Sequence, residues 1–181
     1  LISVWDKSNV VDLGRFLFDQ NIEIISTGGT KKSLETAGLK VIGIEEITGI
    51  GSVMGGRIKT LNPLIFGGIL ADRENDQHMI DLKALNGLEI DLVVVNFYPF
   101  VKEAIEKKLE FKDAIEYIDI GGPSMIRAAA KNYHSTVPLC DPSMYDHFIK
   151  EYNKTKGNIS LSFRKNTASK VFALTASYEL A

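Results

Sequence analysis

The clearest candidate for chemistry in this chain is a carboxylate that stands directly before a glycine-rich turn. Asp119 precedes Gly121, Gly122 and Pro123, and the helix predicted to start there runs to Lys131. Glycines let the backbone approach a ligand closely, and proline suits the first position of a helix. Asp119 and Lys131 could form an acid–base pair, because a lysine that is partly buried or has a cationic neighbour can lose its proton near neutral pH.

The spacing of this pair leaves two alternatives open. A straight helix from Pro123 to Lys131 holds its ends about 12 Å apart. Lys131 therefore meets a ligand at the helix N-terminus only if the ligand is elongated or if the lysine approaches from the side. The structural alternative is an aspartate that caps the turn and a lysine that is solvated.

A second glycine pair lies in the segment Ser26-Thr-Gly-Gly-Thr30, between an apolar run and a helical pattern. Gly28 and Gly29 let backbone N–H groups converge, and a helix N-terminus adds partial positive charge. Ser26, Thr27 and Thr30 add hydroxyl groups. The segment predicts a phosphate site, although an ordinary strand-to-helix turn gives the same pattern. It matches neither a Walker P-loop nor a dinucleotide fingerprint.

Two cations occupy a second glycine-rich stretch. Arg57 and Lys59 are two residues apart, so an extended backbone places both side chains on one face. Pro63 argues against a long helix in this stretch. The pair suits a phosphate group or a developing oxyanion, and its alternative is a solvated basic loop.

Polar residues also follow two of the predicted strands. Asn96 and Tyr98 come after the apolar run Val93–Val95, and Asp6 and Lys7 follow the first strand. Ligands of open α/β sheets bind beyond the carboxyl ends of the strands, which makes these positions candidates for a cleft. The alternative for Tyr98 is a half-buried aromatic at a strand end.

Short β-rich runs alternate with helical patterns along the chain, which predicts an α/β fold: a three-layer open parallel sheet with helices on both faces. The predicted strands are Leu1–Trp5, Ile22–Ser26, Lys40–Ile44, Ile65–Leu70, Asp91–Phe97 and Thr136–Cys140. The predicted helices are Val10–Asn21, Thr30–Ala37, Asp76–Leu85, Pro123–Lys131, Pro142–Tyr152 and one or two within Ser160–Ala181. The whole chain, 1–181, is expected to be one domain.

Composition narrows the possible functions. The net charge of −2 over 181 residues gives no general attraction to nucleic acid or to an anionic membrane. Cys140 is the single cysteine, and the three histidines lack metal-ligand spacing, so we expect neither disulfides nor a metal site. The chain has no apolar run of membrane-spanning length and no signal-peptide pattern. We therefore expect a cytoplasmic protein.

Seven segments, in order along nearly the whole chain, resemble the IMP cyclohydrolase domain of the bifunctional purine-biosynthesis enzymes. They are Ile2–Lys7, Ser26–Thr30, Gly56–Pro63, Gly67–Leu70, Asp91–Phe100, Ile118–Pro123 and Arg127–Asn132. The resemblance implies a methylglyoxal-synthase-like fold and ring closure of 5-formamido-imidazole-4-carboxamide ribotide (FAICAR) to IMP with loss of water. It implies no cofactor and no metal. It also implies a homodimer and a formyltransferase domain that follows in the natural chain.

Site residues follow from the same resemblance. The implied catalytic group is Lys59, Tyr98, Asp119 and Lys131. The implied substrate and phosphate contacts are Asp6, Lys7, Thr27, Gly28, Gly29, Thr30, Arg57, Thr60, Asn96 and Ile120. The chain departs from the family pattern at four places, where the family usually has Ser instead of Trp5 and histidines instead of Asn62, Phe66 and Leu174.

Two other functions remain open at this point. Methylglyoxal synthase shares the fold and a phosphate loop, but it needs a carboxylate base for chemistry on dihydroxyacetone phosphate. A non-catalytic nucleotide-binding module, like the allosteric domain of carbamoyl phosphate synthetase, also shares the fold. Turnover of each substrate separates the two enzymes, and IMP binding without turnover would indicate the module.

Overall fold

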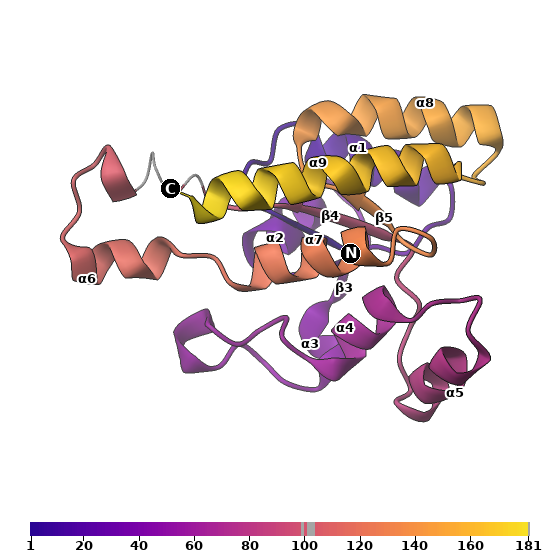
Figure 1. The fold of residues 1–181 in the computed structure, drawn as a ribbon, viewed down its shortest axis with the longest axis horizontal. Coiled ribbons are helices and arrows are strands. Elements are labelled where there is room, and N and C mark those ends of the chain that lie inside the picture. Colours follow the sequence, from indigo (N-terminus) through magenta and orange to yellow (C-terminus); the bar gives the residue numbers. More distant parts are fainter. Residues whose placement is uncertain (99, 101–103, 181) are drawn as a thin grey trace.

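A parallel β-sheet forms the centre of the computed structural model, which describes residues 1–98, 100 and 104–180 (Figure 1). The strand order is β3-β2-β1-β4-β5, and every neighbouring pair is parallel. The strands are β1 (Ile2–Val4), β2 (Ile25–Ser26), β3 (Ile42–Gly43), β4 (Leu92–Asn96) and β5 (Val137–Leu139). The prediction of an open parallel sheet is therefore confirmed.

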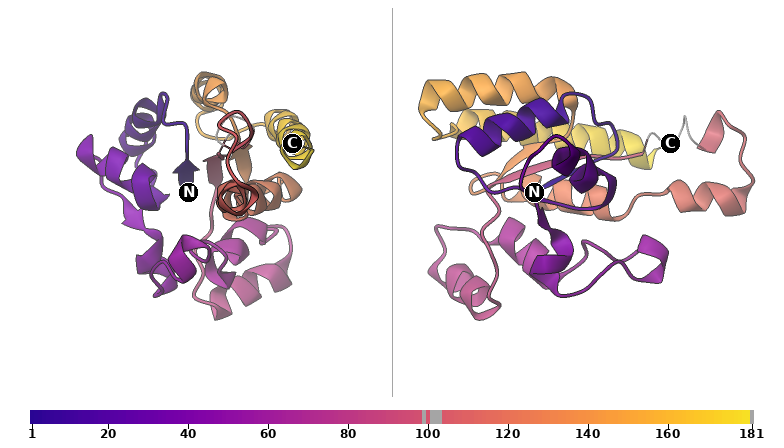
Figure 2. Two further views of the ribbon diagram at one scale, coloured as in Figure 1. Left: turned by 90° about the vertical axis from the view of Figure 1, so that its left-hand side faces the viewer. Right: turned by 180° about the vertical axis from the view of Figure 1, so that it is seen from behind.

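Helices cover both faces of this sheet. On one side α1 packs against α2 and α8, and on the other α7 packs against α4 and α9, as the two views of Figure 2 also show. The longer helices are α1 (Val10–Asp19), α2 (Gly28–Thr36), α4 (Pro63–Leu70), α5 (Asp76–Ala84), α7 (Gly121–Lys131), α8 (Tyr145–Thr155) and α9 (Leu161–Glu179). The shorter ones are α3 (Ile44–Thr48), η1 (Met54–Gly56), α6 (Phe111–Ala114), η3 (Ile115–Tyr117) and η4 (Pro142–Met144).

Strand β4 is buried on both faces of the sheet. Val93, Val94 and Val95 in β4 are at most 1% exposed, as expected for an apolar strand between two helical layers. This rigid centre fixes where the carboxyl ends of β1 and β4 point.

One predicted strand is wrong. Ile65–Leu70 belongs to helix α4, because Asn62 caps this segment and Pro63 occupies its first turn. Asn62 Oδ1 accepts a hydrogen bond of 2.9 Å from the Leu64 N–H. A short apolar run does not distinguish a strand from a buried helix, whereas the cap and the proline do.

Smaller differences concern element ends. Helix α2 begins at Gly28 instead of Thr30, and the tail forms the single helix α9. Pro99, inside one of the resembling segments, and Ala181, at the end of the predicted tail, lie outside the described residues. Among the described helices, none combines the length and the apolar character that a membrane crossing requires.

The strand order reverses between β1 and β4, which are neighbours although β2 and β3 lie between them in sequence. Such a switch point is where open α/β sheets bind ligands. Two segments, the η1 loop and the stretch around α6, project from one end of the molecule (Figure 1).

Candidate active site

A cavity of about 720 Å³ lies at the switch point, beyond the carboxyl ends of β1, β2 and β4. Its volume suits a small-molecule ligand. Five stretches of chain far apart in sequence contribute its walls: 3–7, 27–30, 55–60, 96–98 and 115–125. Of the residues predicted as catalytic, it brings together Lys59, Tyr98 and Asp119.

The N-terminus of α2 forms one end of this cavity. Thr27 is extended (φ −144°, ψ 154°), and Gly28 then adopts a left-handed conformation with φ +54°. That conformation favours glycine and turns the chain sharply into the helix. The first N–H groups of a helix have no intrahelical partner, and the helix dipole adds positive charge. This end can therefore hold an anion.

Two lysines lie over the same helix terminus. A methyl group added to Gly28 would lie 2.8 Å from Lys59 Nζ, and one added to Gly29 would lie 3.8 Å from Lys7 Nζ. Lys7 Nζ also donates to the carbonyl of Trp5 at 3.2 Å, which holds the amine near the cavity. Two ammonium groups beside free N–H groups are suited to a phosphate.

The three hydroxyls predicted to line this end differ in their partners. Ser26 Oγ donates to the Ile2 carbonyl at 2.7 Å. Thr30 Oγ1 donates to the Val4 carbonyl at 2.9 Å and accepts from the Val4 N–H at 3.1 Å. Ser26 thus joins β2 to β1, and Thr30 joins α2 to β1. Thr27 Oγ1 differs, because it is buried without a hydrogen-bond partner among the described residues.

Strand β1 already uses the hydroxyl groups of Ser26 and Thr30, and the phosphate contact expected of these residues stays a prediction. Thr30 can still offer its backbone N–H to a ligand, as a first-turn residue of α2. Thr27 lines the cavity and keeps an unused hydroxyl, so it is the side chain of this segment best placed to bind.

Asp119 lies at the other end of the cavity, just before α7. Its Oδ1 accepts from the Gly122 N–H at 2.9 Å, and its own N–H donates to Tyr178 Oη at 2.8 Å. Burial raises the pKa of Asp119 above its ordinary value, and the N–H groups of Gly122 and Gly121 oppose this by less. A carboxyl with a raised pKa is suited to proton transfer nearer neutral pH.

Helix α7 presents a second N-terminus to the cavity. A methyl group added to Gly121 would lie 2.8 Å from Thr60 Oγ1, so the buried Thr60 lies against the first turn. Ile120, at the N-cap position, lines the cavity and is 58% exposed. Thr60 and Ile120 thus both line the cavity, and their contacts with a ligand stay predictions.

Tyr98 extends from the carboxyl end of β4 and is 42% exposed. Its ring centroid lies 6.2 Å from that of Trp5 and 6.2 Å from that of Tyr117. Its side chain lines the main cavity and also a smaller one of about 390 Å³ on the side of α9. The phenol is thus accessible to a ligand.

Asn96 forms hydrogen bonds with the backbone of Trp5 and Asp6. Asn96 Oδ1 accepts from the N–H groups of Trp5 and Asp6 at 2.7 and 2.8 Å, and its Nδ2 donates to the Asp6 carbonyl at 3.0 Å. The amide therefore fixes the chain after β1. Asp6 lines the smaller cavity, and hydrogen bonds from Ser8 lower the pKa of its carboxyl.

Arg57 lines the mouth of the main cavity, where it forms an ion pair with Glu116. The two residues come from the two projecting segments. Sequence reasoning missed Glu116, because a lone glutamate in a helical stretch carries no signal. It also missed Tyr178, which approaches Asp119 from the distant helix α9.

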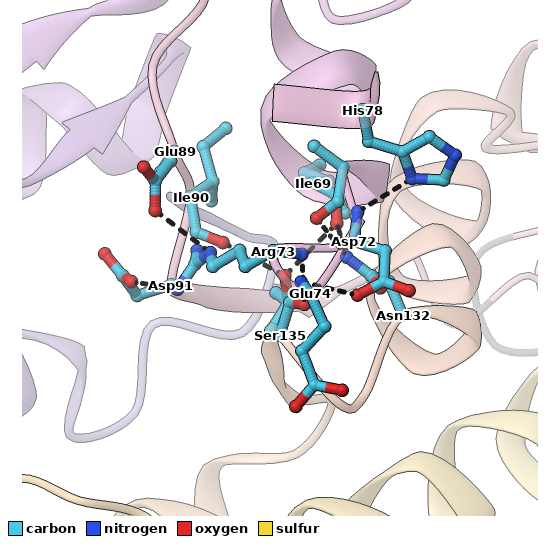
Figure 3. A network of polar contacts seen from close by, with 12 residues as sticks. Ile69, Asp72, Arg73, Glu74, His78, Glu89, Ile90, Asp91, Asn132 and Ser135 are labelled. Atoms are coloured by element: carbon cyan, nitrogen blue, oxygen red, sulfur yellow. Dashed lines mark hydrogen bonds and ion pairs between the residues drawn. The ribbon is translucent and has the colours of Figure 1, made fainter. Parts of the chain in front are cut away.

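Lys131 lies outside the cavity. Helix α7 begins at the site and rises about 15 Å over the ten residues after Gly121. Its far end is anchored by Asn132, whose Nδ2 donates to the carbonyls of Ile69 and Ala71, both at 2.9 Å (Figure 3). Within one chain, the structure separates Lys131 from Asp119, so their pairing is not supported.

The described part of the chain contains no group of three or more His, Cys, Asp or Glu side chains that could hold a metal ion. The fold and the cavity define a doubly wound α/β domain with a helix N-terminus suited to an anion at its switch point.

Comparison with known proteins agrees with this class. A family model for the MGS-like domain matches residues 9–124, and a model for the AICARFT/IMPCHase bienzyme matches residues 129–181. The chain therefore belongs to the MGS-like domain family, and the methylglyoxal-synthase-like fold that the resemblance implied is confirmed.

Individual relatives are similar over the entire chain. The bifunctional purine biosynthesis protein PurH of Clostridium botulinum (strain Hall) is 51% identical over 100% of this chain. The PurH of Lactobacillus acidophilus is 51% identical over 99% of it. This chain spans only about a third of these relatives, 36% and 35%. A crystal structure of ForH superposes with a TM-score of 0.86 at 32% identity, covering 99% of this chain and 91% of that one.

Proposed function

We propose that this chain is an IMP cyclohydrolase, which closes the ring of FAICAR to form IMP and water. The convergence of Lys59, Tyr98 and Asp119 on one cavity carries the proposal. The similarity to proteins named for purine biosynthesis supports it. The cavity has a cationic end and a carboxyl end, which suits an elongated ligand with a phosphate at one end and a reacting heterocycle at the other.

The cationic end binds the phosphate of the ribotide. The first N–H groups of α2 and the amines of Lys7 and Lys59 face the same spot. Thr27 contributes its unpartnered hydroxyl. Binding here supplies orientation, because ring closure is intramolecular and aligned intramolecular reactions reach effective molarities of about 10⁵ M or more.

The chemistry takes place at the other end. The carboxamide nitrogen attacks the formyl carbon, and a C–N bond forms while charge develops on the formyl oxygen. Tyr98 donates a hydrogen bond to that oxygen, a contribution of about 10²-fold. Asp119 accepts the proton that the nitrogen loses. The C–O bond then breaks, and the oxygen leaves as water with two protons: the one held by Asp119 and the one that the former formamide N–H loses. One N–H remains in the closed ring.

Lys59 serves both ends in this proposal. Its amine lies at the α2 terminus, where it balances the phosphate, and a side chain with four rotatable bonds also reaches toward the developing oxyanion. A catalytic role for Lys131 is not part of the proposed mechanism of a single chain. The homodimer, the formyltransferase domain and the cytoplasmic location remain predictions.

The test is formation of IMP from FAICAR, followed by ultraviolet absorbance. The unmodified chain should turn over FAICAR, and Lys59→Ala should lower kcat/KM about 10²- to 10³-fold. Tyr98→Phe should lower kcat about 10²-fold. Tyr133→Phe is the matched control, because Tyr133 lines neither cavity. IMP binding without any turnover of FAICAR would replace this function with a nucleotide-binding module.

A further inference from the structure

Trp5 has an unusual place in this molecule. It follows β1 directly, lines both the main cavity and the smaller one, and is 39% exposed. Tryptophan is on average highly buried because of its large apolar surface. An indole left open to two cavities is therefore available for contact with a ligand.

The backbone of Trp5 is held firmly. Its N–H donates to Asn96 Oδ1 at 2.7 Å and lies 3.3 Å from the Asn96 carbonyl, and its own carbonyl accepts from Lys7 Nζ at 3.2 Å. These contacts come from β4 and from the phosphate end of the cavity. The indole thus projects from an anchored point between the two ends of the site.

Trp5 also belongs to an apolar wall. The Trp5 and Tyr98 rings are tilted by 55° with centroids 6.2 Å apart, which is within the range of attractive aromatic contacts. Ile118 and Ile120 line the same cavity and are 48% and 58% exposed. The lining of the cavity thus includes apolar and aromatic side chains, while Lys7 and Lys59 make the α2 end cationic.

We propose, building on the cyclohydrolase function above, that Trp5 determines specificity by forming with Tyr98 the surface on which the planar heterocycle of the ribotide packs. A ligand with an anion at one end and a flat ring at the other matches both ends of the cavity.

The chain contains one tryptophan, so tryptophan emission excited selectively, without its tyrosines, reports on Trp5 alone. Titration with IMP should change this emission with saturation, because the heterocycle covers the indole. Ribose 5-phosphate, which carries the anion without the base, should compete with IMP and leave the emission almost unchanged. An unchanged emission at IMP concentrations that inhibit the enzyme fully would overturn the proposal.

Substitutions supply a second measurement. Trp5→Ser should raise KM for FAICAR about five- to hundredfold, the range for loss of one aromatic–base contact, with kcat changed less than KM. Trp5→Phe keeps a ring and should restore most of the affinity. Phe18→Ser removes an exposed aromatic of α1 that lines neither cavity, and it should leave KM unchanged.

The two proposals fail in different ways. If Trp5→Ser has the KM of the unmodified chain while FAICAR is still converted to IMP, the role of Trp5 is wrong and the cyclohydrolase function stands. If the unmodified chain forms no IMP, the function is wrong, and with it the specificity role of Trp5.

Discussion

At the carboxyl group of Asp119, burial and hydrogen bonding act in opposite directions. Burial raises the pKa of Asp119, and the N–H groups of Gly122 and Gly121 limit that rise. The ionised form is therefore costly in the folded chain but still has hydrogen-bond donors. This balance suits a group that must both accept and release a proton.

The first prediction concerns the pH dependence that Asp119 imposes. If the ionised carboxylate is the base, kcat/KM falls as the pH falls through its pKa, and that limb lies above the ordinary value of 3.8. Asp119→Asn should lower kcat about 10²- to 10⁴-fold and remove the limb. An Asn variant that keeps the acid limb would show that another group produces it.

The same residue predicts a trade-off between stability and activity. Because the pKa of Asp119 is higher in the folded than in the unfolded chain, the folded state holds its proton more tightly, and stability is lost as pH rises through the folded pKa. Asp119→Asn should therefore raise the Tm near neutral pH, and the gain should vanish at acidic pH where the carboxyl is neutral. A lower Tm at both pH values would contradict this.

Substitution of Thr27 should change KM, whereas substitution of Asp119 should change kcat. Its buried hydroxyl has no hydrogen-bond partner among the described residues, so Thr27→Val should leave the free energy of unfolding unchanged or raise it, since an unpaired polar group is costly. The same change should raise KM, because the proposed function assigns this hydroxyl to the phosphate of the substrate. A large fall in kcat at constant KM would argue against this positioning role.

At the scale of elements, the entry into α2 depends on Gly28. Gly28→Ala places a side chain at φ +54° and a methyl group 2.8 Å from Lys59 Nζ. It should lower stability by about 1 kcal/mol and also raise KM severalfold by displacing the lysine. Steady-state kinetics and denaturant unfolding measure the two effects separately.

Gly38→Ala is the matched control for Gly28→Ala. Gly38 has φ +84°, and a methyl group there meets no atom of the described chain within 4 Å. It should lower stability by a similar amount and leave KM unchanged. An equal rise of KM in both variants would mean that backbone strain alone, and not the displaced lysine, affects binding.

Two adjacent glycines of helix α4 should differ in how their substitution by alanine changes stability. A methyl group on Gly68 would lie 2.2 Å from the Leu88 carbonyl oxygen, whereas one on Gly67 would make an ordinary contact of 3.4 Å with Leu82. Gly68→Ala should therefore destabilise the protein by about 1 to 3 kcal/mol, while Gly67→Ala should be neutral or stabilising because alanine favours helix. Denaturant unfolding of both variants tests the packing of α4.

At the scale of the whole molecule, the two ends of the sheet have separate tasks. The carboxyl end bears the cavity, and the other end bears the contacts of Figure 3, where Asn132 joins α7 to α4 and Arg73 pairs with Glu89 and Asp91. Asn132→Leu should cost about 1 to 3 kcal/mol of stability without changing KM, because it removes the hydrogen bonds that Asn132 Nδ2 donates to the carbonyls of Ile69 and Ala71. Asn153→Ala is the control. Asn153 is exposed on α8, so its substitution should change neither the stability nor KM.

Much of this architecture can be predicted from local sequence patterns, that is, from the order and spacing of apolar residues along the chain. Alternating β and helical runs predicted the parallel sheet, and the apolar run around Val94 predicted a strand buried on both faces. The predicted strand Ile65–Leu70 is a helix instead, because Asn62 caps the segment and Pro63 fits the first turn of a helix.

What the sequence by itself determined is the fold class, the glycine turns that open α2 and α7, and the types of residue at the strand ends, because these depend on local backbone preferences and on hydrophobic period. Only the tertiary structure decided which polar groups remain free. It assigned the Thr30 hydroxyl to β1, the Asn96 amide to the chain after β1, and Lys131 to the edge away from the cavity. The physical reason is that a hydrogen-bond partner is chosen by proximity in space, which sequence spacing does not specify.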